Sequence, residues 1–193
     1  MQRWMMIALM FLPFLFHGCA LSAVMTGSTF YDIYAVGVDE RGLYTLAKDK
    51  RIKTQIQAAI LDDKQTSILD VGVDSFYGKV ILVGEYETQK ELTRLREIVG
   101  GVEGVREVTE HLLPMRQRQQ CGRGDDLSLL AKVKTALFED KKVWGTDVHV
   151  YTVQCQVVLG GIVATKMERD RAIALAKGVR GGRMVTSYIR ALQ

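Results

Sequence analysis

Histidine and cysteine are scarce in this chain of 193 residues, which has three of each. No pair of them has the spacing of a metal site. The sequence also lacks the G-x-S-x-G motif and any glycine-rich phosphate loop. A catalytic triad built from distant residues leaves no such signature, so these absences argue only against the enzyme classes that carry these motifs. We expect no catalytic residues, no metal and no cofactor.

Long apolar runs are equally rare, and the one that occurs lies at the start of the chain. WMMIALMFLPFLF, residues 4–16, follows the basic Arg3 and is shorter than the roughly 20 residues that a membrane-spanning helix needs. It is typical of a secretory signal peptide, which we place at residues 1–18. Cys19 follows at once, as in the lipobox of bacterial lipoproteins, whose cysteine is acylated. The alternative is a buried cysteine in an ordinary apolar segment. We expect lipidation at Cys19, at the head of an N-terminal segment over residues 19–47.

The rest of the chain is a tandem repeat. QAAILDDK at Gln57 aligns with KTALFEDK at Lys134, and the same offset of 77 residues holds without a gap for about fifty residues. Each copy opens with apolar residues at helical spacing and continues with two segments that alternate in period two. A Thr-x-x-Glu capping box, at Thr88 and Thr165, then starts a second helix. A last strand follows, so each copy predicts helix, strand, strand, helix, strand.

This order of elements resembles the BON domain. The resemblance rests on the acidic pair that ends the first helix, on the glycine that closes the second strand (Gly84 and Gly161), and on the step GVEGV at residues 101–105. In the second copy Gly182 replaces the last valine of this step. We therefore expect the final strand of the second copy to start differently.

The resemblance implies an α+β fold and a division of the chain into domains. In each copy a small three-stranded sheet packs against two helices. The two domains cover residues 48–114 and 125–193, and a linker covers residues 115–124. A signal peptide, a lipobox and two such domains are similar to the outer-membrane lipoproteins of Gram-negative bacteria that carry two BON domains. That likeness implies a location at the periplasmic face of the outer membrane, binding of anionic phospholipid and support of outer-membrane integrity, without catalysis.

Charge is distributed unevenly between the two copies. Residues 48–114 carry ten basic and twelve acidic side chains, a balance of −2, whereas residues 115–193 carry fourteen and seven, a balance of +7. This asymmetry indicates an anionic partner for the linker and second domain, although a basic face that is merely solvated gives the same count. Export disfavours nucleic acid as that partner.

The candidate phospholipid-binding site lies at the end of the helix that opens the second domain. Lysines lie on and just after this helix, followed by a tryptophan, which favours the boundary between headgroups and acyl chains. The candidate residues are Lys132, Lys134, Lys141, Lys142, Val143 and Trp144. The alternative is that Trp144 fills the core of a small domain. Its counterpart in the first copy is Ser67, and because core positions should agree between repeats, the serine favours an exposed tryptophan.

Two function classes stay open on this sequence. The first is a lipid-binding module that docks on the periplasmic leaflet. The second is an adaptor for other envelope proteins, or for the acidic first domain, with no lipid contact beyond the anchor.

Lipidation of Cys19 leaves Cys121 and Cys155, an even number in an exported protein. Cys155 aligns with Gly78 in a predicted hairpin turn, so its thiol should lie near the surface. Cys121 lies in the linker. We expect a disulfide between them if their Cα atoms come within about 7 Å, and it would fasten the linker to the second domain.

Overall fold

The computed structural model describes residues 42–67, 69–115 and 121–193. The predicted signal peptide, the lipidation site at Cys19 and most of the N-terminal segment lie outside the described residues, as does most of the predicted linker, residues 116–120. Among the helices in the described ranges, none is long and apolar enough to cross a membrane.

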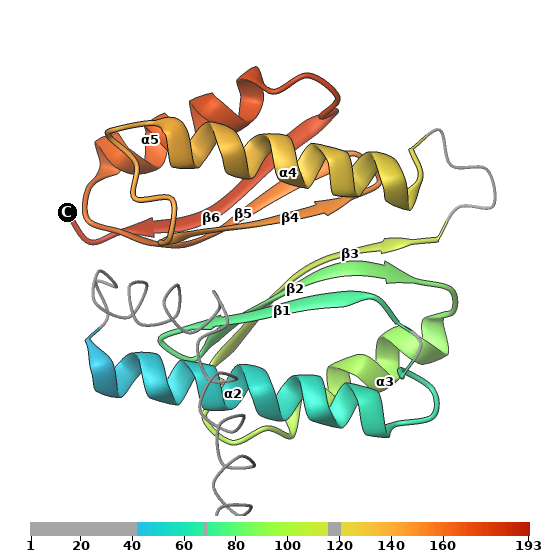
Figure 1. Ribbon diagram of the computed structural model, residues 1–193. Helices are drawn as coiled ribbons and strands as arrows, with labels where there is room; N and C mark the ends of the chain where they lie inside the picture. Colours follow the sequence, from blue (N-terminus) through green and yellow to red (C-terminus); the bar gives the residue numbers. More distant parts are fainter. Residues whose placement is uncertain (1–41, 68, 116–120) are drawn as a thin grey trace, which may run out of the picture. The chain divides into compact units, whose positions relative to one another are not determined.

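The first domain has the predicted order of helix, strand, strand, helix, strand (Figure 1). Its elements are α2 (Leu43–Asp62), β1 (Val71–Phe76), β2 (Lys79–Tyr86), α3 (Gln89–Gly100) and β3 (Glu107–Pro114). β1 and β2 form an antiparallel hairpin, and β3 pairs parallel with β2 after the crossover through α3. The sheet order is therefore β1-β2-β3, with β2 in the centre. α2 begins before the boundary predicted at residue 48.

The second domain repeats this topology. Its elements are α4 (Arg123–Glu139), β4 (Val148–Val153), β5 (Gln156–Val163), α5 (Lys166–Gly178) and β6 (Met184–Ala191). α4 begins inside the predicted linker. The sheet order is β4-β5-β6, with β4 antiparallel and β6 parallel to the central β5.

The final strands of the two domains start at equivalent positions, so the expectation that Gly182 shifts the start of β6 is wrong. β3 begins at Glu107 and β6 begins 77 residues later at Met184. Just before each strand, a backbone N–H donates to a carbonyl in the hairpin turn at 2.8 Å, from Arg106 to Gly78 and from Arg183 to Cys155. These bonds set the start of the strand through the backbone, and a change of side chain at residue 182 leaves them in place.

In each domain both helices cover the same face of the sheet (Figure 1). The first core consists of Ile52, Ile56, Ile60, Val73, Val80, Leu82, Leu95 and Val99. The second core is built in the same way from α4, α5 and their sheet. It has less apolar bulk under its second helix, because Ala172 and Ala176 occupy the positions of Leu95 and Val99.

The glycine that closes the second strand of each domain is required by a close backbone contact. A Cβ at Gly84 would lie 2.4 Å from the carbonyl oxygen of Asp70, and a Cβ at Gly161 would lie 2.0 Å from that of Asp147. Both distances are far below van der Waals contact. Any larger residue therefore forces the hairpin apart at its open end.

The faces of the two sheets that the helices leave free pack against each other. Both domains belong to one compact unit, Val38–Gln193. A third core joins Phe76, Ile81, Val83, Val153, Val158 and Ile162. Glycine makes room for the opposite sheet, since a Cβ at Gly72 would lie 2.5 Å from the Tyr151 ring. The central strands are thus buried on both faces, unlike most antiparallel hairpins.

A buried carboxylate, Asp74 on β1, lies at this contact between the sheets. Lys53 of α2 pairs with its Oδ1 at 2.7 Å. Its Oδ2 lies 2.6 Å from His149 Nδ1 and accepts a hydrogen bond from the Tyr151 hydroxyl. Burial disfavours the charged form, but the hydrogen bond and charge of His149 and the charge of Lys53 outweigh it and lower the pKa of Asp74 to about 2. An ionised aspartate therefore links the two domains.

Burial and the negative charge of Asp74 raise the pKa of Tyr151. Its hydroxyl consequently stays protonated and serves as a donor to the carboxylate. The hydrogen bonds between the domains are strong, because the charged carboxylate of Asp74 accepts them from side chains of the second domain.

The lowered pKa of Asp74 predicts acid-sensitive packing. Since its usual value is 3.8, the carboxylate contributes stability that is fully present above about pH 4 and is lost as pH falls through 2. We expect Asp74→Asn to lower the free energy of unfolding at pH 7 by about 2 kcal/mol. The difference from wild type should shrink between pH 4 and pH 2. Urea denaturation at several pH values measures it, with the exposed Asp62→Asn as control. A difference that stays constant over this range contradicts the assignment.

Candidate functional site

Helix α4 carries several of the candidate residues and buries a single stripe. Leu129, Val133 and Leu137 face the second core, and their spacing of four residues places them one turn apart on one side of the helix. The opposite side of α4 faces solvent, so its side chains are free to meet a partner.

One solvent-facing flank of α4 exposes large apolar side chains. Leu127 and Phe138 are 67% and 52% exposed. Lys134 lies seven residues after the first and four before the second, and these spacings place all three on one face of the helix. The Phe138 ring also borders the loop that follows α4, where a Cβ at Gly145 would lie 3.1 Å from it. An apolar strip with a lysine within it therefore runs towards this loop.

Trp144, in that loop, is held by its backbone while its indole is exposed. Its N–H donates to Glu168 Oε1 at 2.9 Å, and its carbonyl accepts from the N–H of Asp147 at 2.9 Å. Glu168 is buried near the start of α5 and also accepts from the N–H of Ala164. The Trp144 side chain is 54% exposed, so it does not fill the core.

The four candidate lysines do not gather on one face. Lys132 and Lys134 are two residues apart on α4, which places them about 200° apart around the helix axis, on opposite flanks of the buried stripe. α4 ends at Glu139, so Lys141 and Lys142 lie in the turn that follows. None of the four forms an ion pair with another residue of the described ranges, where the lysines that do are Lys53 and Lys79.

Val143 is misassigned by the sequence prediction. It is 7% exposed and belongs to the second core. The prediction that it inserts into a bilayer is therefore wrong, because the side chain has no free apolar surface. The apolar part of the site comes instead from α4, whose exposed residues the sequence analysis missed.

Exposed residues of this flank of α4 and of the turn that follows it define what we call the α4 surface. It consists of Leu127, Lys134, Phe138, Lys141, Lys142 and Trp144. The first domain has Lys50, Gln57, Leu61, Lys64, Gln65 and Ser67 at the equivalent positions. Of these residues Leu61 alone is a large apolar residue. The repeat alignment therefore contained a signal for Leu127 as well as for Trp144, but none for Phe138, whose counterpart Leu61 is also apolar.

Comparison with known families agrees with this repeat architecture. The BON domain family matches residues 48–113 and 125–193. The chain belongs to this family.

Three relatives resemble the chain at 26% identity over most of its length. They are osmotically-inducible protein Y of Escherichia coli, with 88% of this chain and 90% of that protein aligned, the 21 kDa hemolysin of Actinobacillus pleuropneumoniae, with 81% and 73%, and the outer membrane lipoprotein DolP of Haemophilus influenzae, with 91% and 89%. Each alignment is more than twice as long as one BON domain, so the likeness is not confined to one domain.

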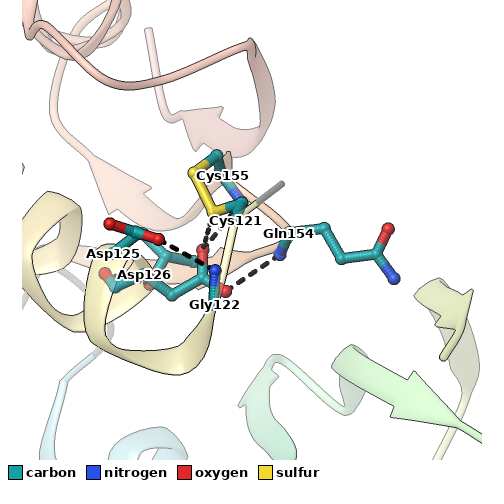
Figure 2. The surroundings of a disulfide bond; sticks show 7 residues. Cys121, Gly122, Asp125, Asp126, Gln154 and Cys155 are labelled. Carbon is teal, nitrogen blue, oxygen red and sulfur yellow. Dashed lines mark hydrogen bonds between the residues drawn. A yellow bond between two sulfur atoms is a disulfide. The ribbon is translucent and has the colours of Figure 1, made fainter. Parts of the chain in front are cut away.

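Each BON domain uses an aspartate from its first helix to hold the turn of its hairpin. Asp49 accepts hydrogen bonds from the N–H groups of Tyr77 and Gly78, both at 2.8 Å. Asp126, 77 residues later, accepts from Gln154 at 3.0 Å and Cys155 at 2.8 Å (Figure 2). This pair was not predicted from the sequence, although the offset of 77 aligns the two aspartates.

The second BON domain adds a covalent link at the same turn. Cys121 and Cys155 form a disulfide, and their Cα atoms lie 5.8 Å apart (Figure 2). This is within the reach that the sequence argument required, and the bond ties the residue before the N-cap of α4 to the hairpin turn. Cys155 is 9% exposed. The expectation that it lies near the surface is therefore wrong, because Cys121 and the start of α4 cover the turn.

This cluster is the one place in the described ranges where side chains approach the grouping of a metal site. The sulfur atoms of Cys121 and Cys155 and a carboxylate oxygen of Asp126 lie within 4.8 Å of one another. The two sulfurs are bonded to each other, and thiolates are the species that bind metals. The oxidised cluster therefore offers a single carboxylate, which already accepts two backbone N–H groups.

Proposed function

We propose that this chain is a non-enzymatic envelope lipoprotein that docks on anionic phospholipid through the α4 surface of its second BON domain and supports outer-membrane integrity. The observation that carries the proposal is the combination of exposed Leu127, Phe138 and Trp144 with exposed lysines that form no ion pair within the described ranges. Apolar side chains and lysines exposed together are the composition expected at a membrane interface.

The two parts of the α4 surface contribute in different ways. Lys134, Lys141 and Lys142 attract the surface to anionic headgroups at about 1 kcal/mol each, a term that salt screens. Phe138 and Trp144 supply an apolar term that salt does not screen. Both aromatic side chains lie at the same end of α4, since Phe138 borders Gly145. Docking of this kind is weak and reversible by itself.

The N-terminal anchor makes weak docking sufficient. Acylation of Cys19 would hold the second domain close to the membrane and raise its effective concentration there. A tri-acylated lipoprotein has more than the two signals that stable anchoring takes. One relative, DolP, is named an outer membrane lipoprotein, which supports the same location for this chain, at the periplasmic face. Residue 20 is alanine and not the aspartate that commonly retains lipoproteins at the inner membrane.

Binding to vesicles tests the α4 surface directly. With residues 1–19 removed from every variant, we expect the protein to cosediment with vesicles that contain phosphatidylglycerol at low salt. Trp144→Ala and Phe138→Ala should each lower the affinity about tenfold, which corresponds to about 1.4 kcal/mol of apolar contact. Lys141→Glu with Lys142→Glu should flatten the salt dependence. Leu61→Ala is the matched control, because Leu61 occupies the position of Phe138 in the first domain.

The same measurement separates the lipid-binding module from an adaptor for envelope proteins. A protein without residues 1–19 that does not bind anionic vesicles at low salt favours the adaptor and contradicts the proposal. Circular dichroism of each variant shows whether it is folded. If Trp144→Ala and Phe138→Ala are folded and bind like wild type, the contact lies elsewhere on the molecule.

Lipidation is tested by fractionation of cells. We expect the wild-type protein to stay with membranes after a wash in high salt, because an acyl anchor is not released by screening. A protein in which residues 1–19 are replaced by a signal peptide that is cleaved without acylation should move to the soluble fraction in the same wash, since the α4 surface alone binds weakly. If that protein stays with the membranes, the anchor is contradicted.

A further inference from the structure

The two BON domains stabilise the same hairpin turn by different means. In both turns the two central residues have positive φ, 55° at Tyr77 and 75° at Gly78 in the first domain, 50° at Gln154 and 58° at Cys155 in the second. Glycine adopts this conformation readily, whereas a residue with a Cβ is disfavoured there. The second domain thus places cysteine where the first places glycine.

The aspartate from the first helix does not account for this difference. Asp49 and Asp126 each accept the two N–H groups of their turn. The additional element in the second domain is the bond from Cys155 to Cys121. The residue equivalent to Cys121 in the first domain is Tyr44, which is 82% exposed and makes no comparable link.

The disulfide closes a long loop and is shielded once formed. It joins residues separated by 34 positions, a segment that contains α4 and β4. A crosslink of this span restricts the unfolded chain. The cysteines are 2% and 9% exposed, so reductants have little access to the sulfur atoms in the folded protein. The bond therefore has the properties of a stable structural disulfide and not of one that is reversibly reduced in the folded protein.

We propose that oxidation of Cys121 and Cys155 is the step that completes folding of the second BON domain, and that it confines a stable α4 surface to the exported, oxidised chain. The two thiols form one disulfide and transfer two electrons and two protons to the disulfide of a thiol oxidant, which leaves as a dithiol. The bond then compensates for the unfavourable left-handed conformation of Cys155 and fixes the start of α4. The first BON domain, with Gly78, folds without such a step. This proposal does not depend on which partner the α4 surface binds.

Paired substitutions in the full chain test whether the disulfide stabilises the second domain. Every protein carries Cys19→Ser to remove acylation and the third thiol. We expect Cys121→Ser with Cys155→Ser to lower Tm by roughly 5–15 °C. Cys121→Ser with Cys155→Gly should regain about 2–4 °C of that loss in Tm. Glycine at residue 155 adopts positive φ without the penalty of a Cβ, as Gly78 does in the first domain. If the variant with two serines is as stable as the parent, the disulfide does not complete folding and the proposal is overturned. If the variant with Cys155→Gly is no more stable than the variant with two serines, the left-handed conformation of residue 155 does not destabilise the turn, and that part of the proposal is overturned.

Hydrogen exchange compares the two hairpin turns within the wild-type protein, so it tests the proposal even if a variant fails to fold. In the oxidised protein we expect the amides of Gln154 and Cys155 to be as protected as those of Tyr77 and Gly78. After the protein is unfolded, reduced with a dithiol and returned to native buffer with the dithiol present, protection should be lost at residues 154 and 155 and kept at 77 and 78. Equal protection at both turns in the reduced protein overturns the proposal.

Discussion

The packing of one sheet against the other is the interaction on which the rest of this structure depends. Each sheet is covered on one face by its own helices and has apolar residues on the other, so neither domain buries its apolar surface alone. The third core, with Phe76, Ile81 and Val158 among its members, buries the second apolar face of both sheets. The ionised Asp74 adds a specific link across it. Because both sheet faces are then covered, the helices face the surroundings and are available to a partner.

The tandem repeat separates what the fold requires from what is particular to the second domain. The positions that agree between copies do structural work: Asp49 and Asp126 hold the turns, and Gly84 and Gly161 allow the close contact of the hairpin. Some positions that differ lie in the core, where Ala172 and Ala176 replace Leu95 and Val99. Others lie on the outer side of α4, where packing makes no demand. These outer differences consist of apolar residues and lysines, which the fold does not explain and which the proposed membrane contact would explain.

Much of the fold follows from the sequence because the repeat fixes the element order twice. The docking of the two sheets was not predicted, although the unbroken apolar run at residues 80–83 indicates a strand buried on both faces. Trp144 was assigned correctly to an exposed position because its counterpart is Ser67. Val143 was assigned wrongly, since nothing in a short apolar-aromatic pair tells which side chain turns inward. The burial of Cys155 depends on the chain before α4, whose path the local turn pattern does not determine.

Fluorescence of Trp144 tests the central claim, that the second BON domain meets the membrane through the α4 surface. The chain has two tryptophans, Trp4 and Trp144, and Trp4 lies in the segment that the signal peptidase would remove. In protein produced without residues 1–19, Trp144 is therefore the sole indole. Vesicles of anionic phospholipid should shift its emission to the blue, and lipids brominated near the headgroup end of the acyl chains should quench it. Protein that binds these vesicles while its emission stays unchanged would contradict the account.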